Sequence, residues 1–461
     1  MKTVKCIFWS IFLTMLAFSC ANLNDSSIIT VSNEGDAMYK SIQLAVDNAK
    51  PGSLILIKPG VFKENIIIDK SLRIKGSGTD KTIIMANPEL YLSAEAIKDI
   101  SEKIKSVEPP EKREAAGLEM MAKFFKPMVL VKNASKIEIS GLKMMAPVLD
   151  GKLASAQPYI IQITNASVLL IDCSVTGAKD GVLIEDKSDV TIKNSLFAGL
   201  HRAGITIGKC ERDECNVNIL DSDIRNCYYA GIIIRQGSQK VLISNSRISG
   251  SAWHGIRYDD SSPEIRDNLI FANARSGIYA SGKTNGIIEG NVFYKNEMCG
   301  IAFYGKNRDM ISGNVLASNL REGVLITDSS CQPEFKNNIF YDNPISISLW
   351  KMKTAETNLH FENNIFWGNR NIAVLQHKEE SGKVISEDIA LPKDSQSLIL
   401  DPDFKDVPGR DFSPSPESPA RIKSTGVTGH IKFDSPWKLT PEEINIIPES
   451  DTRDSTKWKI K

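Results

Sequence analysis

The chain has 461 residues, and its 56 Lys and Arg balance its 56 Asp and Glu, so its formal net charge at pH 7 is +0. This balance excludes nucleic acid as the main partner, because binding to nucleic acid requires a strongly basic face. None of the 8 cysteines lies in a paired Cys-x-x-Cys motif with a nearby His, so we predict no metal site built from them.

The N-terminus has the arrangement of a secretory signal. Lys2 and Lys5 precede an apolar run from Ile7 to about Phe18, which is too short to span a bilayer comfortably. The segment that closes this run resembles a bacterial lipobox and reads Leu16-Ala17-Phe18-Ser19-Cys20. The resemblance implies a lipoprotein signal over residues 1–20, with Cys20 lipidated and holding the protein to a membrane. The alternative is an ordinary signal that is cut nearby.

We predict a tether over residues 21–35, followed by an amphipathic helix over 36–50 that ends at Pro51-Gly52. The face of this helix that packs inward carries Ile42, Ala45, Val46 and Ala49. A helix at this place covers the open edge of the first coil in a stack of strands, which would otherwise invite aggregation.

Short strands are predicted after the helix, at 54–57 and 66–68, with a turn at Pro59-Gly60. This order resembles the N-terminal cap and first coil of pectin methylesterases, including Gly60-Val61-Phe62-Lys63-Glu64 in place of their Gly-x-Tyr-x-Glu motif. The resemblance ends there, because the motifs that carry the catalytic groups of that family are absent. The Asp-Pro-His-Asp element of β-helical alginate epimerases is absent too, so no catalytic residue carries over.

Residues 88–127 interrupt the strands with Leu, Ile and Met at helical spacing and with Pro109-Pro110 in the middle. We predict two helices on a side loop. Two roles stay open for this insertion, a decoration that shields one flank of the structure and a lid over a groove.

A glycine followed by an aliphatic residue recurs at intervals of 22 to 27 residues, which is the period of a solenoid. These glycines are Gly181, Gly204, Gly231, Gly255, Gly277, Gly300 and Gly323. Two files rich in asparagine keep the same period, five residues apart, as in Asn268 and Asn273. We predict that Gly and Asn supply the left-handed backbone of the turns, and that the Asn files add ladders of side-chain amides.

Apolar residues alternate within each repeat, so the elements are strands and not helices. Strands this short can stack coil on coil into parallel sheets. We therefore predict an all-β solenoid over residues 36–425, a single-stranded right-handed parallel β-helix of about 11 coils. The chain resembles the pectin-lyase-like superfamily and the right-handed β-helix repeat proteins over roughly residues 35–425. One inward file is predicted to contain Ile205, Ile232, Ile256, Ile278 and Ile301.

The longest interval contains Cys210 and Cys215, and a protruding loop closed by a disulfide between them would explain its extra length. The remaining cysteines of the folded part fall in different columns, as small buried thiols do. These are Cys173, Cys227, Cys299 and Cys331.

Near the C-terminus, Asp401-Pro402-Asp403-Phe404 followed by Ser418-Pro419-Ala420 resembles the closing segment of many bacterial β-helix proteins. The chain then becomes polar and rich in proline. We predict a loosely ordered tail over residues 426–461.

Outward positions of the coils follow from the glycine register, because side chains alternate along a strand. The middle coils, residues 228–304, gather aromatic and charged side chains at these positions, whereas the flanking coils offer small or aliphatic ones. The set is Tyr229, Arg235, Trp253, His254, Arg257, Asp259, Asp260, Tyr279 and Tyr304. Aromatic rings beside Arg and carboxylates suit a sugar polymer, particularly an acidic one, through stacking and charge-assisted hydrogen bonds.

Binding alone would use Tyr229, Arg235, Trp253 and Tyr304. A lyase or epimerase would also need a base, for which His254 or Tyr279 are candidates, and a cation that stabilises the developing charge, Arg257 or Arg235.

Hydrolysis would instead use two carboxylates, for which Asp259 and Asp260 are available only if a turn begins between them. The alternative is that both are turn residues before Ser261-Ser262-Pro263. A calcium ion at these acids has too few identified ligands, so no cofactor is predicted.

The sequence thus predicts a monomeric lipoprotein of the bacterial cell envelope, at the outer membrane or cell surface. Its predicted partner is a polysaccharide bound along the central coils, and any activity would be of the lyase or epimerase type rather than that of a pectin methylesterase. The alternative is a non-enzymatic surface scaffold or adhesin that binds a protein partner.

Overall fold

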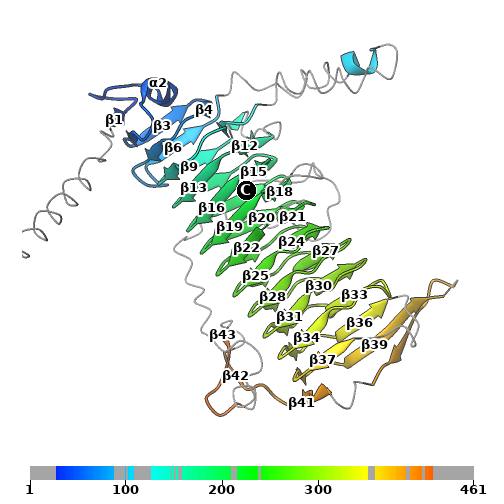
Figure 1. Ribbon diagram of the computed structural model, residues 1–461. Coiled ribbons are helices and arrows are strands. Elements are labelled where there is room, and N and C mark those ends of the chain that lie inside the picture. Colours follow the sequence, from blue (N-terminus) through cyan, green and yellow to red (C-terminus); the bar gives the residue numbers. More distant parts are fainter. Residues whose placement is uncertain are drawn as a thin grey trace, which may run out of the picture.

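The computed structural model describes residues 27–87, 99, 102–107, 126–146, 148–149, 152–153, 158–208, 215–236, 240–350, 359–379, 381–390, 395–406 and 411–418. Within these residues the chain winds into a long stack of coils, shown in Figure 1. A coil contributes one strand to each of three sheets, and neighbouring strands in a sheet come from consecutive coils. We name the sheets A, B and C.

Sheet A contains β1 (Ile28–Val31), β2 (Leu54–Ile57), β5 (Arg73–Lys75), β8 (Ile137–Ser140), β13 (Ser167–Ile171), β16 (Asp189–Lys193), β19 (Asn216–Leu220), β22 (Lys240–Ser244), β25 (Glu264–Arg266), β28 (Ile287–Glu289), β31 (Met310–Ser312), β34 (Glu334–Lys336) and β37 (His360–Glu362). Sheet B contains β3 (Gly60–Lys63), β6 (Thr82–Met85), β9 (Lys143–Met145), β14 (Ser174–Thr176), β17 (Leu196–Leu200), β20 (Asp223–Cys227), β23 (Arg247–Ser249), β26 (Leu269–Phe271), β29 (Val292–Tyr294), β32 (Val315–Ala317), β35 (Ile339–Tyr341), β38 (Ile365–Trp367) and β41 (Leu398–Ile399).

Sheet C contains β4 (Ile66–Ile68), β7 (Val129–Lys132), β12 (Tyr159–Thr164), β15 (Asp180–Glu185), β18 (Ala203–Ile207), β21 (Ala230–Ile234), β24 (His254–Asp259), β27 (Ile278–Ser281), β30 (Cys299–Tyr304), β33 (Glu322–Ile326), β36 (Ile345–Trp350), β39 (Asn371–Lys378) and β40 (Val384–Asp388). Only β40 pairs antiparallel within this 13-stranded sheet, so the described coils number about twelve, one more than predicted. Two small antiparallel pairs lie outside the sheets, β10 (Val148–Leu149) with β11 (Lys152–Leu153), and β42 (Phe404–Asp406) with β43 (Asp411–Pro414).

The repeated glycines lie on top of one another in sheet C, which confirms the predicted solenoid. A Cβ atom on Gly204 would lie 2.7 Å from the carbonyl oxygen of Gly231, and one on Gly231 would lie 2.7 Å from that of Gly255. The predicted reason for this file was wrong, because none of its seven glycines has a positive φ. Close approach of successive coils, not a left-handed backbone, requires glycine here.

The predicted file that contains Asn194, Asn245 and Asn268 does not occupy one equivalent position in every coil. Its members occupy two neighbouring positions. Asn194 and Asn245 have φ of 47° and 51° and form turns, while Ser195 and Ser246, which follow them, are buried. From Asn268 onward the asparagine itself takes the inward position, and its Nδ2 donates to Oδ1 of Asn291 at 2.9 Å. The predicted amide ladder is therefore confirmed, and it continues through Asn314, Asn338 and Asn364.

The predicted inward file is also confirmed. Ile205, Ile232, Ile256, Ile278 and Ile301 pair in register and are fully buried. Because each coil places an aliphatic side chain directly against the next, the interior is one continuous apolar core.

The N-terminal end of the stack is covered by the helix α2 (Ile42–Asn48), inside the predicted range 36–50. Ile42, Ala45 and Val46 are its buried residues, and the Glu64 carboxylate accepts hydrogen bonds from the first backbone N–H groups of the helix. Packed structure begins earlier than predicted, because part of the tether proposed for 21–35 is strand β1, which pairs in parallel with β2.

Several predicted segments lie outside the described residues. These are the signal over 1–20 with Cys20, the tail over 426–461, and most of the insertion at 88–127, where residues 102–105 are described and helical. None of the described helices has the length and apolar character needed to cross a membrane.

Candidate functional site

Aromatic rings from four consecutive coils follow one another along the outer face of sheet C. Tyr229 and Trp253 have ring centroids 5.3 Å apart, and His254 and Tyr279 have centroids 4.8 Å apart. Tyr279 stacks on Tyr304, again at 4.8 Å and with 25° between the ring planes. We call these residues, together with Arg257, Asp259 and Arg275, the aromatic surface. Apart from Arg235 and Asp260, the structure therefore brings the predicted outward residues together.

Arg257 is the centre of the aromatic surface. Its guanidinium carbon lies 5.6 Å from the ring centroid of Tyr229 and 5.1 Å from that of Tyr279, within the range of cation–π contacts. The same guanidinium donates to the Tyr229 hydroxyl and makes two hydrogen bonds to Asp259, at 2.8 and 3.2 Å. Asp259 also accepts a hydrogen bond from the Ser281 hydroxyl. These contacts hold Arg257 and both rings in one arrangement.

The two candidate bases are poorly suited to remove a proton. His254 is only 5% exposed, and burial, together with the positive charges of Arg275 and Arg257, lowers its pKa to about 3. Its Nδ1 has no hydrogen-bond partner in the part of the chain that the structure describes. Burial raises the pKa of Tyr279, so its phenol stays protonated at neutral pH. A general base must reach the proton that it takes, so this arrangement favours binding over proton abstraction.

Arg235 and Asp260 lie at the border of the aromatic surface. Arg235 follows β21, and extending the register of Ile234 with Tyr258 places it one coil before Asp259. Asp260 has a φ of 46°, so a turn begins between Asp259 and Asp260, and its Oδ1 accepts a hydrogen bond from Lys283 N at 2.8 Å. The turn that a carboxylate pair would need is therefore present, but the two carboxylates bind different partners. Asp260 is a turn residue, as the alternative predicted, whereas Asp259 is the last residue of β24.

The predicted disulfide falls only partly within the structure, because Cys210 lies outside the described residues. Cys215 is fully buried in the interior, and its thiol donates to the carbonyl oxygen of Asp186 at 2.9 Å. The disulfide between Cys210 and Cys215 therefore stays a prediction.

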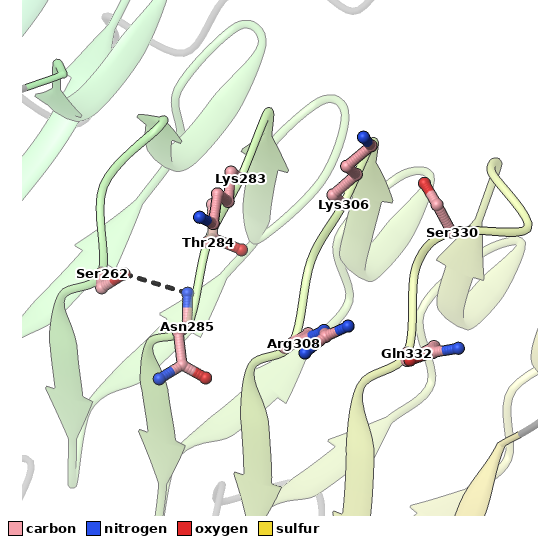
Figure 2. Close-up of a pocket in the computed structure, with 8 residues that line it drawn as sticks. All are labelled: Ser262, Lys283, Thr284, Asn285, Lys306, Arg308, Ser330 and Gln332. Carbon is pink, nitrogen blue, oxygen red and sulfur yellow. Dashed lines mark hydrogen bonds between the residues drawn. The ribbon is translucent and has the colours of Figure 1, made fainter.

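A second site lies where the chain turns from sheet C into sheet A. Figure 2 shows this groove of about 710 Å³, whose lining residues come from four consecutive coils in two files. One file is Ser262, Asn285, Arg308 and Gln332, and the other is Lys283, Lys306 and Ser330, with Thr284 between them. We call this the cationic groove, after its two lysines and its arginine.

The repeat pattern does not predict the cationic groove, because turn residues lack the alternation that marks outward positions in strands. The glycine register contains a usable signal nonetheless. Lys283 and Lys306 follow Gly277 and Gly300 by six residues each, and Asn285 and Arg308 follow the same glycines by eight.

Two family models match parts of the chain. Residues 236–388 match a model described as "Right handed beta helix region", and residues 145–305 match one described as "Periplasmic copper-binding protein (NosD)". The described residues bring no three His, Cys, Asp or Glu side chains together as metal ligands, so they do not fit a copper site. No curated protein matches the chain in sequence.

Several solved structures are similar to this one at low sequence identity. A mannuronic-acid-specific family 6 polysaccharide lyase from human gut microbiota is 13% identical. The match covers 77% of this chain and 83% of the lyase chain, with a TM-score of 0.51. The Dettilon tailspike protein is 14% identical, with 69% of this chain and 60% of that chain covered and a TM-score of 0.48. The A-module of the mannuronan C-5 epimerase AlgE6 from Azotobacter vinelandii is 14% identical. The match covers 72% of this chain and 94% of that chain, with a TM-score of 0.45.

At such identities the likeness establishes the fold and not the activity. The stacked coils, the glycine file and the match over residues 236–388 agree on one architecture. The chain is a right-handed parallel β-helix protein with the pectin-lyase-like fold.

Proposed function

We propose that this protein binds a polysaccharide along the aromatic surface. The observation that carries the proposal is the fixed arrangement of Arg257 between the rings of Tyr229 and Tyr279, continued by Tyr304 on the next coil. Sugar rings stack on aromatic side chains, and an arginine beside them donates hydrogen bonds to hydroxyl or carboxylate oxygens. The similar family 6 structure is, by its title, a lyase specific for mannuronic acid, which agrees with this proposal.

Binding rather than turnover is the role that the geometry favours. The buried His254 and the protonated Tyr279 are poor bases, and the Asp259 carboxylate is engaged by Arg257 and Ser281. Cleavage or epimerisation at this surface would require one of these groups to be rearranged by the substrate.

We also propose that the protein resides in the cell envelope, anchored through a lipid on Cys20. The signal-like N-terminus supports this, and so does the match to a family whose model is described as periplasmic. Replacing Cys20 with Ala is expected to move the protein from the membrane fraction to the soluble fraction, measured by immunoblotting of fractionated cells. Unchanged fractionation would reject the anchor.

The binding proposal is tested by isothermal titration calorimetry against a panel of neutral and acidic glycans. Tyr279→Ala and Tyr304→Ala are expected to weaken binding about 5-fold each, since one aromatic contact contributes roughly 1 kcal/mol. Trp367→Ala is the matched control, because Trp367 is an aromatic residue 40% exposed on sheet B. Equal affinities of all three variants and the native protein would reject the aromatic surface as the site.

A further inference from the structure

The cationic groove lies beside the aromatic surface, across the edge of sheet C. Tyr304 ends β30, and Gly305 and Lys306 follow it directly. Lys283 and Lys306 occupy equivalent positions on consecutive coils, and Arg308 lies in the neighbouring file (Figure 2). Successive coils are about 4.8 Å apart, so the lining side chains repeat along the stack at close to the length of one sugar ring.

A sharp turn directs the two lysines outward. Gly282 and Gly305 have φ of 78° and 102°, a backbone conformation that glycine adopts without strain. A Cβ atom on Gly282 would lie 2.3 Å from Oδ1 of Asp260, and that same oxygen accepts a hydrogen bond from the backbone N–H of Lys283. The lysines therefore leave the sheet at a fixed corner.

A buried polar network supports the floor of the groove. The Asp309 carboxylate, fully buried, accepts hydrogen bonds at 2.9 Å from the Tyr258 hydroxyl and from the backbone N–H of Gly286. It also accepts one from the Thr284 hydroxyl, whose oxygen in turn accepts from Asn307 Nδ2 at 2.8 Å. A satisfied network of this kind is rigid, so the turns that carry the cations are held in place before any ligand arrives.

The cations of the groove keep their charge available. Within the described ranges, Lys283, Lys306 and Arg308 form no ion pair within 4.0 Å. Two carboxylates on the adjoining turns are held by turn hydrogen bonds, and the charge of Lys306 acts on one of them, Asp328, whose pKa is lowered by its hydrogen bonds from Ser330 and by Lys306. Asp260 accepts from Lys283 N, and Asp328 accepts from the backbone N–H and the hydroxyl of Ser330. A concave surface lined by cations raises the local concentration of anions.

We propose that the cationic groove binds the carboxylates of an acidic polysaccharide whose chain lies parallel to the axis of the stack. Arg308 is placed to bind one carboxylate through two parallel hydrogen bonds, while Lys283 and Lys306 contact charges on successive sugars. Asn285 and Gln332 supply hydrogen bonds to hydroxyl groups from the same file as Arg308. The inference rests on the proposed function and names its substrate class as a polyuronate.

The test compares two triple variants with equal loss of charge. K283Q/K306Q/R308Q removes the cations of the groove, and K193Q/K240Q/K336Q removes three exposed or half-exposed lysines of sheet A. Binding is measured by calorimetry at several salt concentrations with polymannuronate, polygalacturonate, a neutral glucan and dextran sulfate. Thermal unfolding checks that both variants are folded.

The groove variant is expected to bind a polyuronate about 10-fold more weakly, because three exposed charge contacts each contribute a small free energy. Its affinity should also depend less on salt than that of the native protein. The sheet A variant should bind like the native protein, and binding of the neutral glucan should be the same in all three.

Other outcomes separate the two proposals. Unchanged polyuronate affinity in the groove variant would overturn the groove as the site and leave polysaccharide binding in place. If the native protein binds none of the glycans, the proposed function fails as well. If dextran sulfate binds as tightly as either polyuronate, the assignment to carboxylates is wrong.

Discussion

The aromatic surface and the cationic groove adjoin along one edge of sheet C, yet their polar groups are satisfied in different ways. On the aromatic surface, Arg257 is bonded to Asp259 and Tyr229, and His254 is buried among rings. In the groove, Lys283 and Lys306 project from turns without an ion pair among the described residues. The first surface is therefore a platform fixed by its own contacts, and the second keeps its charge for a ligand.

This difference predicts two kinds of contact with one polymer. Stacking on ring faces depends little on ionic strength, whereas attraction to exposed lysines weakens as salt screens the charges. The two contributions can be separated by changes that affect the shared stack, then the groove alone, then the aromatic surface alone.

The largest loss of stability is expected from a change in the stack of coils that carries both the aromatic surface and the cationic groove. In Gly277→Val, the new Cβ atom would lie 2.7 Å from the carbonyl oxygen of Gly300 and 2.9 Å from the Phe293 ring. The coils would have to separate, at a cost of about 4 kcal/mol in the free energy of unfolding. Chemical denaturation measures this loss, and glycan binding by both surfaces should fall together.

Gly35→Asn is the control for that change. Gly35 has a φ of 65° and open space around the position of a Cβ atom, and asparagine tolerates this backbone conformation. Its free energy of unfolding should change by less than about 0.5 kcal/mol. A Gly277→Val protein as stable as this control would contradict the glycine file as the reason for the coil spacing.

A smaller change is expected to affect the groove alone. Asp309→Ala leaves the Tyr258 hydroxyl and the Gly286 N–H without their buried acceptor, a loss of about 3 kcal/mol in stability. Polyuronate affinity should fall while neutral glucan binding persists, measured by calorimetry on the folded protein. Asp309→Asn keeps an acceptor oxygen and should recover most of both losses. Equal behaviour of the two variants would show that the network does not support the groove.

Features that depend on a repeated local pattern could be predicted from the sequence. Gly204 and Ile205 repeat at a fixed interval with alternating burial, so the stack, its inward file and the outward set around Arg257 could all be read from the chain. The asparagine columns were shifted by one residue at Asn194 and Asn245, because spacing alone does not distinguish a left-handed turn residue from the inward residue after it.

Features formed by residues distant from any repeat could not be predicted. Strand β1 has only four residues, Ile28–Val31, and becomes a strand by pairing with β2, which lies beyond the capping helix. The support of the groove joins Tyr258 to Asp309 across two coils, and nothing in either local sequence indicates that contact. Tertiary pairing, rather than local pattern, decides both.

The stability contributed by the aromatic surface should respond to pH through His254. The pKa of His254 in the native protein, about 3, lies below its ordinary value of 6.5, so between these values the unfolded chain binds a proton that the native protein does not. Stability therefore falls as the pH falls through this window, by about 2 kcal/mol between pH 6.5 and pH 5. His254→Phe keeps a ring against Tyr279 and should lack this component, measured as the difference in unfolding free energy at each pH. Parallel curves would place His254 in a more exposed environment than the structure gives it.

The smallest effect concerns Arg275, whose guanidinium carbon lies 3.8 Å from the ring centroid of Trp253. Arg275→Gln should lower stability by about 1 kcal/mol at neutral pH, the size of one exposed cation–π contact. Because the charge of Arg275 also lowers the pKa of His254, the native state of this variant should take up the proton at higher pH, so the variant should lose less stability than the native protein between pH 5 and pH 3. Arg275→Lys retains the charge and should keep the native pH dependence. If the glutamine variant keeps it too, Arg275 acts on the aromatic surface through packing alone, and burial accounts for the neutral His254.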